Sequence, residues 1–148
     1  MSAPRTPNTF QVVVDCVNPH ALADWWAELM DWVVEDSDPQ FIQQMIDEGH
    51  ATVDDTTTHR GVLVWKTAAA IRHPDDPDRG PRRRFLFQHV PEPKTGKNRV
   101  HIDVRVDDLE ATVARLVATG ATELYRGQEG PSTWVTLTDP EGNEFCVM

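Results

Sequence analysis

The chain has 148 residues and a formal net charge of −10, a balance that repels nucleic acid and anionic membrane surfaces. Its length corresponds to one domain or two small fused halves, and 39% hydrophobic residues allow a core to form without disulfides. Two cysteines, no apolar stretch of membrane-spanning length and an N-terminus without a signal-peptide pattern predict a cytoplasmic protein with reduced thiols.

The first half of the chain predicts a strand, a helix and three more strands. Residues 10–17 are rich in valine, which favours a buried strand. Asn18 and Pro19 then provide the N-cap and the first position of an amphipathic helix. Further elements are expected as strands at residues 32–35, 61–67 and 84–90 and as a short extra helix at residues 37–49.

The same order of elements repeats after residues 91–98, whose Pro, Gly and Lys content is typical of a linker. A strand at residues 99–106 precedes a helix that Asp107 or Asp108 caps and Gly120 ends. The last three strands are expected at residues 121–125, 132–138 and 144–148. Such a repeat predicts an α+β protein of two tandem βαβββ modules, each a mixed sheet with its helix on one face. We therefore divide the chain into a flexible N-terminus at residues 1–9, a first module at 10–90 with an insertion around 37–60, the linker, and a second module at 99–148.

One strand of the second half carries a polar face opposite an apolar one. Alternation within residues 99–106 places His101, Asp103 and Arg105 together on one side of the sheet. A polar row of this kind indicates water, a pocket or a satisfied network. In a pocket, Asp103 would orient the imidazole of His101, and Arg105 would hold a carboxylate or phosphate. A structural His–Asp pair is an equal alternative, and for Arg105 an internal salt bridge to Asp103 or Asp15 is preferred.

Other residues are candidates for lining a small-molecule pocket. Asp15 lies on the same face of the first strand as Gln11, and Trp65 and Trp134 alternate with neighbours that point the other way. A structural hydrogen bond for Asp15 and a core position for either tryptophan remain open. Cys146 is interpreted first as a buried thiol, second as a metal ligand, and third as a nucleophile with His101 as its base.

Several stretches of the sequence resemble one known superfamily. They are "VDCVNPHALADWWAELMDW" (14–32), "FLFQHVPEPKTGKNRVHIDVRV" (85–106), "HIDVRVDDLEATVARLVATGA" (101–121) and "TLTDPEGNEF" (136–145). The chain resembles the vicinal oxygen chelate superfamily, which includes glyoxalase I, bleomycin-resistance proteins, fosfomycin-resistance enzymes and extradiol dioxygenases. The second stretch resembles its actinobacterial glyoxalase-like branch in particular. The resemblance implies two modules that form a curved cup, with helices on the outer face and with a homodimer as the common assembly.

The resemblance also implies metal-ligand positions on the first and last strands of each module. In this chain those positions hold Gln11, Gln88, His101 and Cys146, so the carboxylates usual in the superfamily are missing. Mg²⁺ prefers anionic oxygen, and two amides are poor ligands for Zn²⁺. We therefore expect no tightly bound metal and no other cofactor; if a metal binds, these four residues are its candidate ligands.

Two functions follow from this pattern, and a third reading is possible. The first is a glyoxalase-like small-molecule protein related to lyases, isomerases or dioxygenases, with catalysis by His101, Asp103 and Arg105 and with Gln11, Asp15, Trp65, Gln88 and Trp134 binding the substrate. The alternative is a non-catalytic small-molecule or antibiotic-binding protein of the bleomycin-resistance kind, for which an acidic, aromatic cup suits a cationic ligand. The third reading is a structural or regulatory dimer that has lost its site.

Overall fold

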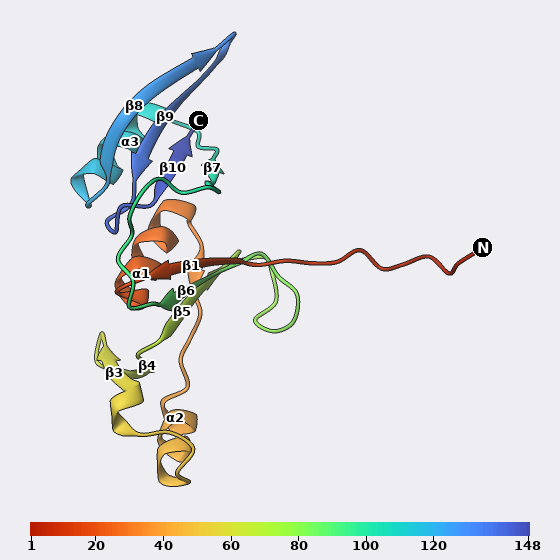
Figure 1. The fold of residues 1–148 in the computed structure, drawn as a ribbon, viewed down its shortest axis with the longest axis vertical. Coiled ribbons are helices and arrows are strands. Elements are labelled where there is room, and N and C mark those ends of the chain that lie inside the picture. The colour runs from red at the N-terminus through yellow and green to blue at the C-terminus, as the bar shows by residue number, and fades with distance from the viewer.

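The computed structural model describes residues 1–148 and shows an elongated molecule (Figure 1). The sheet formed by the second half of the chain lies at one end, helix α1 and the sheet of the first half lie in the middle, and α2 lies at the other end (Figure 1). Residues 1–10 extend away from the body. None of the helices combines the length and the apolar composition that crossing a membrane requires.

Two sheets share one topology. The first contains, in spatial order, β1 (Val12–Cys16), β6 (Arg84–His89), β5 (Ala68–Arg72) and β2 (Val33–Val34). The second contains β7 (Asp103–Val104), β10 (Glu144–Val147), β9 (Ser132–Thr138) and β8 (Thr122–Glu129). In both sheets the first strand pairs in parallel with the last, and the other pairs are antiparallel. With α1 (Pro19–Met30) and α3 (Leu109–Ala118), this arrangement confirms the predicted α+β class of two βαβββ units.

The segment between β2 and β5 forms a separate small unit. It consists of α2 (Pro39–Asp47), the 3₁₀ helix η1 (Val53–Asp55) and a two-stranded hairpin of β3 (Thr56–His59) and β4 (Val62–Trp65). The strand predicted at residues 61–67 exists, but the prediction that it belongs to the sheet of the first module is wrong. Arg60 and Gly61 adopt positive φ angles, and the turn that they form pairs this strand with β3 instead. The first sheet instead uses Ala68–Arg72, an alanine-rich run that gives little strand signal in the sequence.

The strand predicted at residues 99–106 is shorter than expected. Only Asp103–Val104 pairs regularly with β10, and Val100, expected on the buried face, is 84% exposed. The preceding backbone is held differently, because the amide of Asn98 donates to the side chain of Glu144 at 3.0 Å. The polar row on this strand is thus positioned partly by a loop rather than wholly by a ladder.

Helix α1 contacts both sheets and unites their cores. The Trp26 side chain, 3% exposed, packs edge-on against Phe85 of the first sheet and Phe145 of the second. Its indole N–H donates to the buried carboxylate of Asp139 at 3.0 Å. Asp139 lies in the turn between β9 and β10. In this turn the Glu141 carboxylate accepts hydrogen bonds from the backbone amides of Val17 and Asn18, which precede α1, at 2.6 and 3.0 Å. The DPEGN turn of residues 139–143 is therefore the polar contact that fastens one module to the other.

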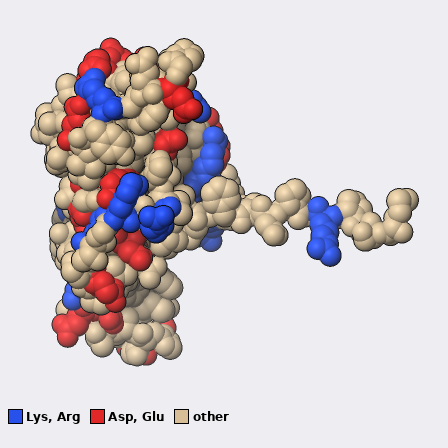
Figure 2. Space-filling model, turned by 45° about the horizontal axis from the view of Figure 1, so that its top comes forward, with Lys and Arg blue, Asp and Glu red and all other residues tan.

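The basic cluster near residue 80 is neutralised in the structure. Arg82 and Arg84 both form ion pairs with Glu35, at 2.7 and 2.9 Å, and Arg83 forms a bidentate pair with Asp76. Arg83 is neutralised by Asp76 of its own loop, whereas Arg82 and Arg84 are neutralised by Glu35, which directly follows β2. Figure 2 shows acidic and basic side chains interspersed over the visible face, without a continuous basic field.

Candidate functional site

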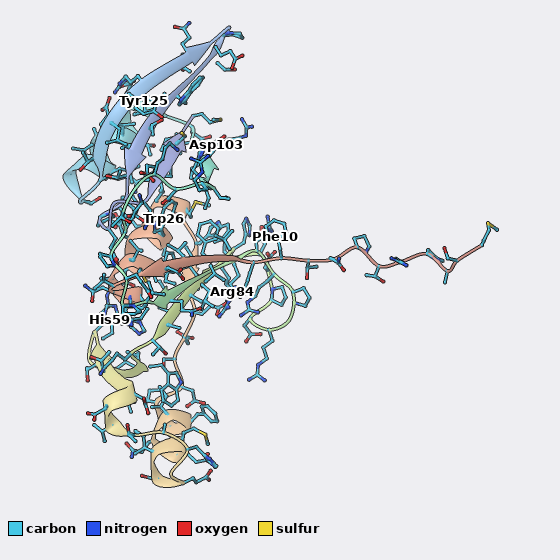
Figure 3. All side chains as sticks on the ribbon, viewed as in Figure 1. Phe10, Trp26, His59, Arg84, Asp103 and Tyr125 are labelled. Carbon is cyan, nitrogen blue, oxygen red and sulfur yellow. The ribbon has the colours of Figure 1, made fainter.

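A row of four side chains crosses the second sheet on the face opposite its core. Asp103 of β7 pairs with Cys146 of β10, which pairs with Thr136 of β9, which pairs with Tyr125 of β8. Their neighbours Phe145, Val147, Val135 and Leu137 point to the other face and are buried. The row is the floor of a pocket of about 390 Å³, and Lys97, His101, Trp134 and Met148 are among its other lining residues. Asp103 and Tyr125 mark its two sides in Figure 3.

Three reactive groups meet in this pocket. The His101 Nε2 and Asp103 Oδ1 atoms are 3.4 Å apart, and both side chains are close to half exposed. Cys146 is only 7% exposed, with its sulfur 3.3 Å from the hydroxyl of Thr136. One nitrogen, one oxygen and one sulfur from His101, Asp103 and Cys146 all lie within 4.8 Å of one another. The buried-thiol interpretation of Cys146 agrees with its burial, and the thiol also borders the pocket.

A second pocket adjoins the first at His101. It has a volume of about 590 Å³ and lies between strand β1, the linker and the start of β10. His101, Glu144 and Phe145 line both pockets. Asp15 and Glu92 supply exposed carboxylates to the larger one, and valines of β1 supply apolar surface. We call the two adjoining pockets the groove; His101 stands where they meet.

Glu144 is a carboxylate on the same face as Cys146, but its oxygens are already engaged. One accepts from Lys94 Nζ at 3.1 Å and the other from the amide of Asn98 at 3.0 Å. Partial burial opposes ionisation of Glu144, yet the hydrogen bonds from Asn98 and Lys94 outweigh it and keep the pKa of this carboxyl below its usual value. Glu144 therefore anchors the linker on the sheet rather than offering a free ligand.

The other cysteine, Cys16, has a buried and unreactive thiol. Cys16 is 4% exposed, and its thiol lies 3.6 Å from the carbonyl oxygen of Gln88. Burial, reinforced by the negative charges of Glu141, Asp139 and Asp15, raises the pKa of this thiol to about 12. A thiol of this kind remains protonated at neutral pH and is neither a nucleophile nor a metal ligand.

Comparison with known proteins places this geometry in a family. The family model described as a glyoxalase-like domain matches residues 11–148. The chain belongs to this glyoxalase-like family. No protein of curated function matches the sequence.

Solved structures of low sequence identity share the fold of this glyoxalase-like chain. The bleomycin-binding protein of Streptomyces verticillus, solved with copper(II)-bleomycin, has a TM-score of 0.54 and 12% identity over 98% of both chains. The trypanothione-dependent glyoxalase I of Leishmania major has a TM-score of 0.56 and 10% identity, over 97% of this chain and 86% of that one. A fosfomycin-resistance protein of Listeria monocytogenes has a TM-score of 0.60 and 5% identity, over 97% and 93%. These matches establish the fold of the vicinal oxygen chelate superfamily.

The structure brings together part of the predicted site. His101, Asp103 and Trp134 line the smaller pocket, and Asp15 lines the larger one. Arg105 is exposed, lines neither pocket and forms no ion pair. Sequence reasoning missed Tyr125 and Thr136, whose signal is the strand register, which alternation along one strand does not give. It also missed Lys97, which lies in the linker, and Glu144, which alternation along β10 places on the same face as Cys146.

The remaining predicted residues lie elsewhere in the glyoxalase-like chain. Gln11 accepts a hydrogen bond from Arg84 at 3.0 Å, near the projecting N-terminal segment. Gln88 lies beside Asp15 on the first sheet but does not line the groove. Trp65 belongs to the β3–β4 hairpin, where its carbonyl oxygen accepts from His20 at 2.7 Å. Of the four metal-ligand positions implied by the superfamily resemblance, His101 and Cys146 lie together, whereas Gln11 and Gln88 line neither pocket of the groove.

Proposed function

We propose that this glyoxalase-like protein binds a small organic molecule in the groove and moves a proton on it through His101. The observation that carries the proposal is the position of His101: it stands where the two pockets meet, 3.4 Å from the Asp103 carboxylate. Histidine is the side chain that most often transfers protons in enzymes, and a neighbouring carboxylate orients its ring. The reaction class would be that of a lyase, isomerase or dioxygenase relative.

The walls of the groove suit a flat or partly aromatic ligand. Trp134 and Tyr125 supply ring surface from neighbouring strands, while Thr136 and the side chain of Lys97 offer polar contacts. Asp103 holds the imidazole at the mouth, so a ligand lying over the sheet would present its reacting atom to His101. Arg105 would join only if its side chain turned toward the groove, so it is the weakest member of the predicted catalytic set.

We also propose that the protein acts as a homodimer in the cytoplasm. Supporting a dimer, apolar side chains at the groove are strongly exposed: Val13 by 47% and Val100 by 84%. Exposed apolar surface beside a cleft favours coverage by a partner. Sedimentation should give twice the mass of one chain, and Val100→Asp should shift the equilibrium toward single chains. A wild-type protein that sediments as a single chain at micromolar concentration would contradict this assembly.

The alternative function is binding without catalysis, and one observation favours it. Asp15 and Glu92 border the larger pocket with exposed carboxylates that have no ion-pair partner, which suits a cationic ligand. The shared fold with a bleomycin-binding protein makes bleomycin the first probe. Placement in the actinobacterial branch stays a prediction.

The test compares binding and turnover in one protein. Candidate ligands are titrated against intrinsic tryptophan fluorescence, with Trp134→Phe identifying the signal from the groove. Any ligand that binds is then followed for chemical conversion by mass spectrometry with wild type and His101→Ala. Conversion that His101→Ala abolishes while binding is retained supports the enzyme. Tight stoichiometric binding of a cationic ligand without conversion supports the binding protein. A fluorescence change on binding that Trp134→Phe leaves unaltered, together with conversion that His101→Ala leaves unaltered, refutes the groove as the site.

A further inference from the structure

The outer strand of the first sheet is much shorter than its counterpart in the second. In the second sheet, β8 pairs with β9 over the whole of Ser132–Thr138. Its counterpart β2 has two residues and pairs regularly only with Ile71 and Arg72 at the end of β5. The chain then leaves the sheet to form α2 and the β3–β4 hairpin. The start of β5 therefore lies at a free edge of the first sheet.

Ala68 presents unpaired backbone groups at this free edge. The carbonyl oxygen of Thr67 accepts a hydrogen bond from the amide of His89 at 2.8 Å, so it faces β6. The carbonyl oxygen of Ala70 faces the opposite side and accepts from the amide of Glu35 at 2.9 Å. Because backbone groups alternate along an antiparallel strand, Ala68 faces the same side as Ala70. No backbone hydrogen bond reaches Ala68 from that side, so its N–H and C=O can pair with an added strand.

A cleft with a volume of about 670 Å³ lies along the free edge. The three alanines at residues 68–70 and Leu86 of β6 supply small apolar surface, and Val64 and Trp65 of the hairpin supply more. Since an alanine side chain ends at Cβ, the backbone of a ligand can come close to this strand. No residue that lines the cleft also lines the groove. The cleft is therefore a separate place for a ligand.

Two histidines and an arginine lie at the end of the cleft where the hairpin meets α1. The imidazoles of His20 and His59 stack with their ring centroids 5.1 Å apart, and His59 is labelled in Figure 3. Their Nε2 atoms donate to the carbonyl oxygen of Trp65 and to the Asp24 carboxylate, each at 2.7 Å, which leaves both Nδ1 atoms without a partner. Arg60 pairs with the same carboxylate, and its side chain is 76% exposed. Protonation of either Nδ1 atom adds a donor for an anion.

The other end of the cleft is acidic. Asp36 is exposed and forms no ion pair, whereas its neighbour Glu35 and Arg84 neutralise each other at 2.9 Å. The register places Glu35 opposite Ala70, and the chain from Ala70 back to Trp65 covers about 17 Å when extended. A peptide of about five residues has this length. Its amine and its carboxylate would lie at ends of the cleft with suitable charges.

We propose that this cleft binds a short linear peptide, which adds to the free edge of β5 as an antiparallel strand. The backbone of the peptide pairs with the N–H and C=O of Ala68, and its small apolar side chains lie against the alanines. Its amine lies beside Asp36, and its carboxylate accepts hydrogen bonds from His59 and Arg60. Peptides that add to a sheet edge in this way draw affinity from main-chain hydrogen bonds. The inference goes beyond the proposed function, and His101 takes no part in it.

The test is a calorimetric titration of the full chain with a pentapeptide of alternating valine and alanine that has free termini. We expect one peptide per chain. The same peptide with an acetylated amine, or with an amidated carboxylate, should bind at least about threefold more weakly, because each loses one ion pair. Amide hydrogen exchange should slow at Ala68 when the free peptide binds and should stay unchanged along β8.

Variants test each contact separately. Ala68→Pro removes the N–H at the free edge and should weaken binding by at least about tenfold. Proline is tolerated at the first residue of an edge strand, so this variant should fold, and circular dichroism checks it. Asp36→Asn should abolish the effect of acetylation, and Arg60→Gln should abolish the effect of amidation. His101→Ala is the matched control and should leave the peptide affinity within about twofold.

Four outcomes would overturn the inference. The first is no binding of the free peptide at millimolar concentration. The second is binding that a folded Ala68→Pro variant retains in full; if this variant does not fold, unchanged hydrogen exchange at Ala68 of the wild type decides in the same sense. The third is an effect of acetylation that disappears in Arg60→Gln, because the peptide would then run in the opposite direction. The fourth is a loss of peptide affinity in His101→Ala, which would place the peptide in the groove.

Discussion

A methyl group added at Gly127 should displace Trp134 and destabilise the second sheet. The two residues face each other across β8 and β9, and the indole lies over the glycine. A Cβ atom at position 127 would be 2.2 Å from Trp134 Cε2 and 2.3 Å from Cζ2. Ordinary carbon contacts are about 3.5 Å or longer, so the ring must move by about 1.3 Å. Overpacking of this kind costs about 1–3 kcal/mol.

An opposing effect reduces this cost. Replacing glycine by alanine limits the unfolded chain and contributes about 0.4–1 kcal/mol of stability. With the middle of each range, the net loss expected for Gly127→Ala is about 1.3 kcal/mol, measured by urea unfolding at fixed pH. The same substitution made in a Trp134→Ala background should be neutral or stabilising, because the clashing ring is gone. A Gly127→Ala protein as stable as wild type, or an equal loss in both backgrounds, would refute the packing argument.

Three other predictions concern the module contact and the charged groups. Asp139→Asn should lower the free energy of unfolding by about 2–4 kcal/mol, because the new amide group would face buried donors such as the Trp26 indole. Chemical denaturation measures this free energy, and a loss under about 1 kcal/mol would contradict the prediction. Burial raises the pKa of Glu35, but hydrogen bonds from Arg82 and Arg84 outweigh the effect of burial and lower this pKa. The stability contributed by the ion pairs is therefore fully present above the pKa of Glu35 in the unfolded chain. It is lost as the pH falls through the pKa of Glu35 in the folded protein. Replacing Glu35 with Gln should therefore flatten the acid limb of a stability–pH curve, and an unchanged slope would count against it. The thiol of Cys16, whose pKa is about 12, should resist iodoacetamide at pH 8 in the native protein and react after unfolding. Mass spectrometry of peptides locates the alkylated residues, and alkylation of Cys16 in the native protein would disprove its burial.

Local sequence patterns predict much of the fold. Valine-rich runs, the Asn18-Pro19 helix start and the Asp108 cap predict β1, α1 and α3, because each depends on neighbours in the chain. The strand Ala68–Arg72 escaped prediction because alanine has little preference for strands, and it forms there through pairing with β6 and burial beneath α1. Pairing across a sheet is a property of the whole fold, not of a short window.

The candidate site also contains one part that local sequence predicts and another part that it does not. Alternation along one strand places His101 and Asp103 on a common face, and this part of the prediction needs no tertiary information. Tyr125 and Thr136 join them only through the register of β8, β9 and β10, and a shift of one residue would remove both. Alternation also places Arg105 on this face, but its exposed side chain lines neither pocket, because the face of a strand does not by itself say how far a pocket extends along it.

Helix α1 makes the two modules unequal despite their common topology. Trp26 contacts aromatic rings of both sheets, and the DPEGN turn of the second module closes on the start of the same helix. A protein assembled from two copies of the second module would lack this bridging helix and would have two sheets without a shared core. The two halves of similar topology are therefore not interchangeable, because the second sheet packs against a helix of the first half, and a turn of the second half holds the start of that helix.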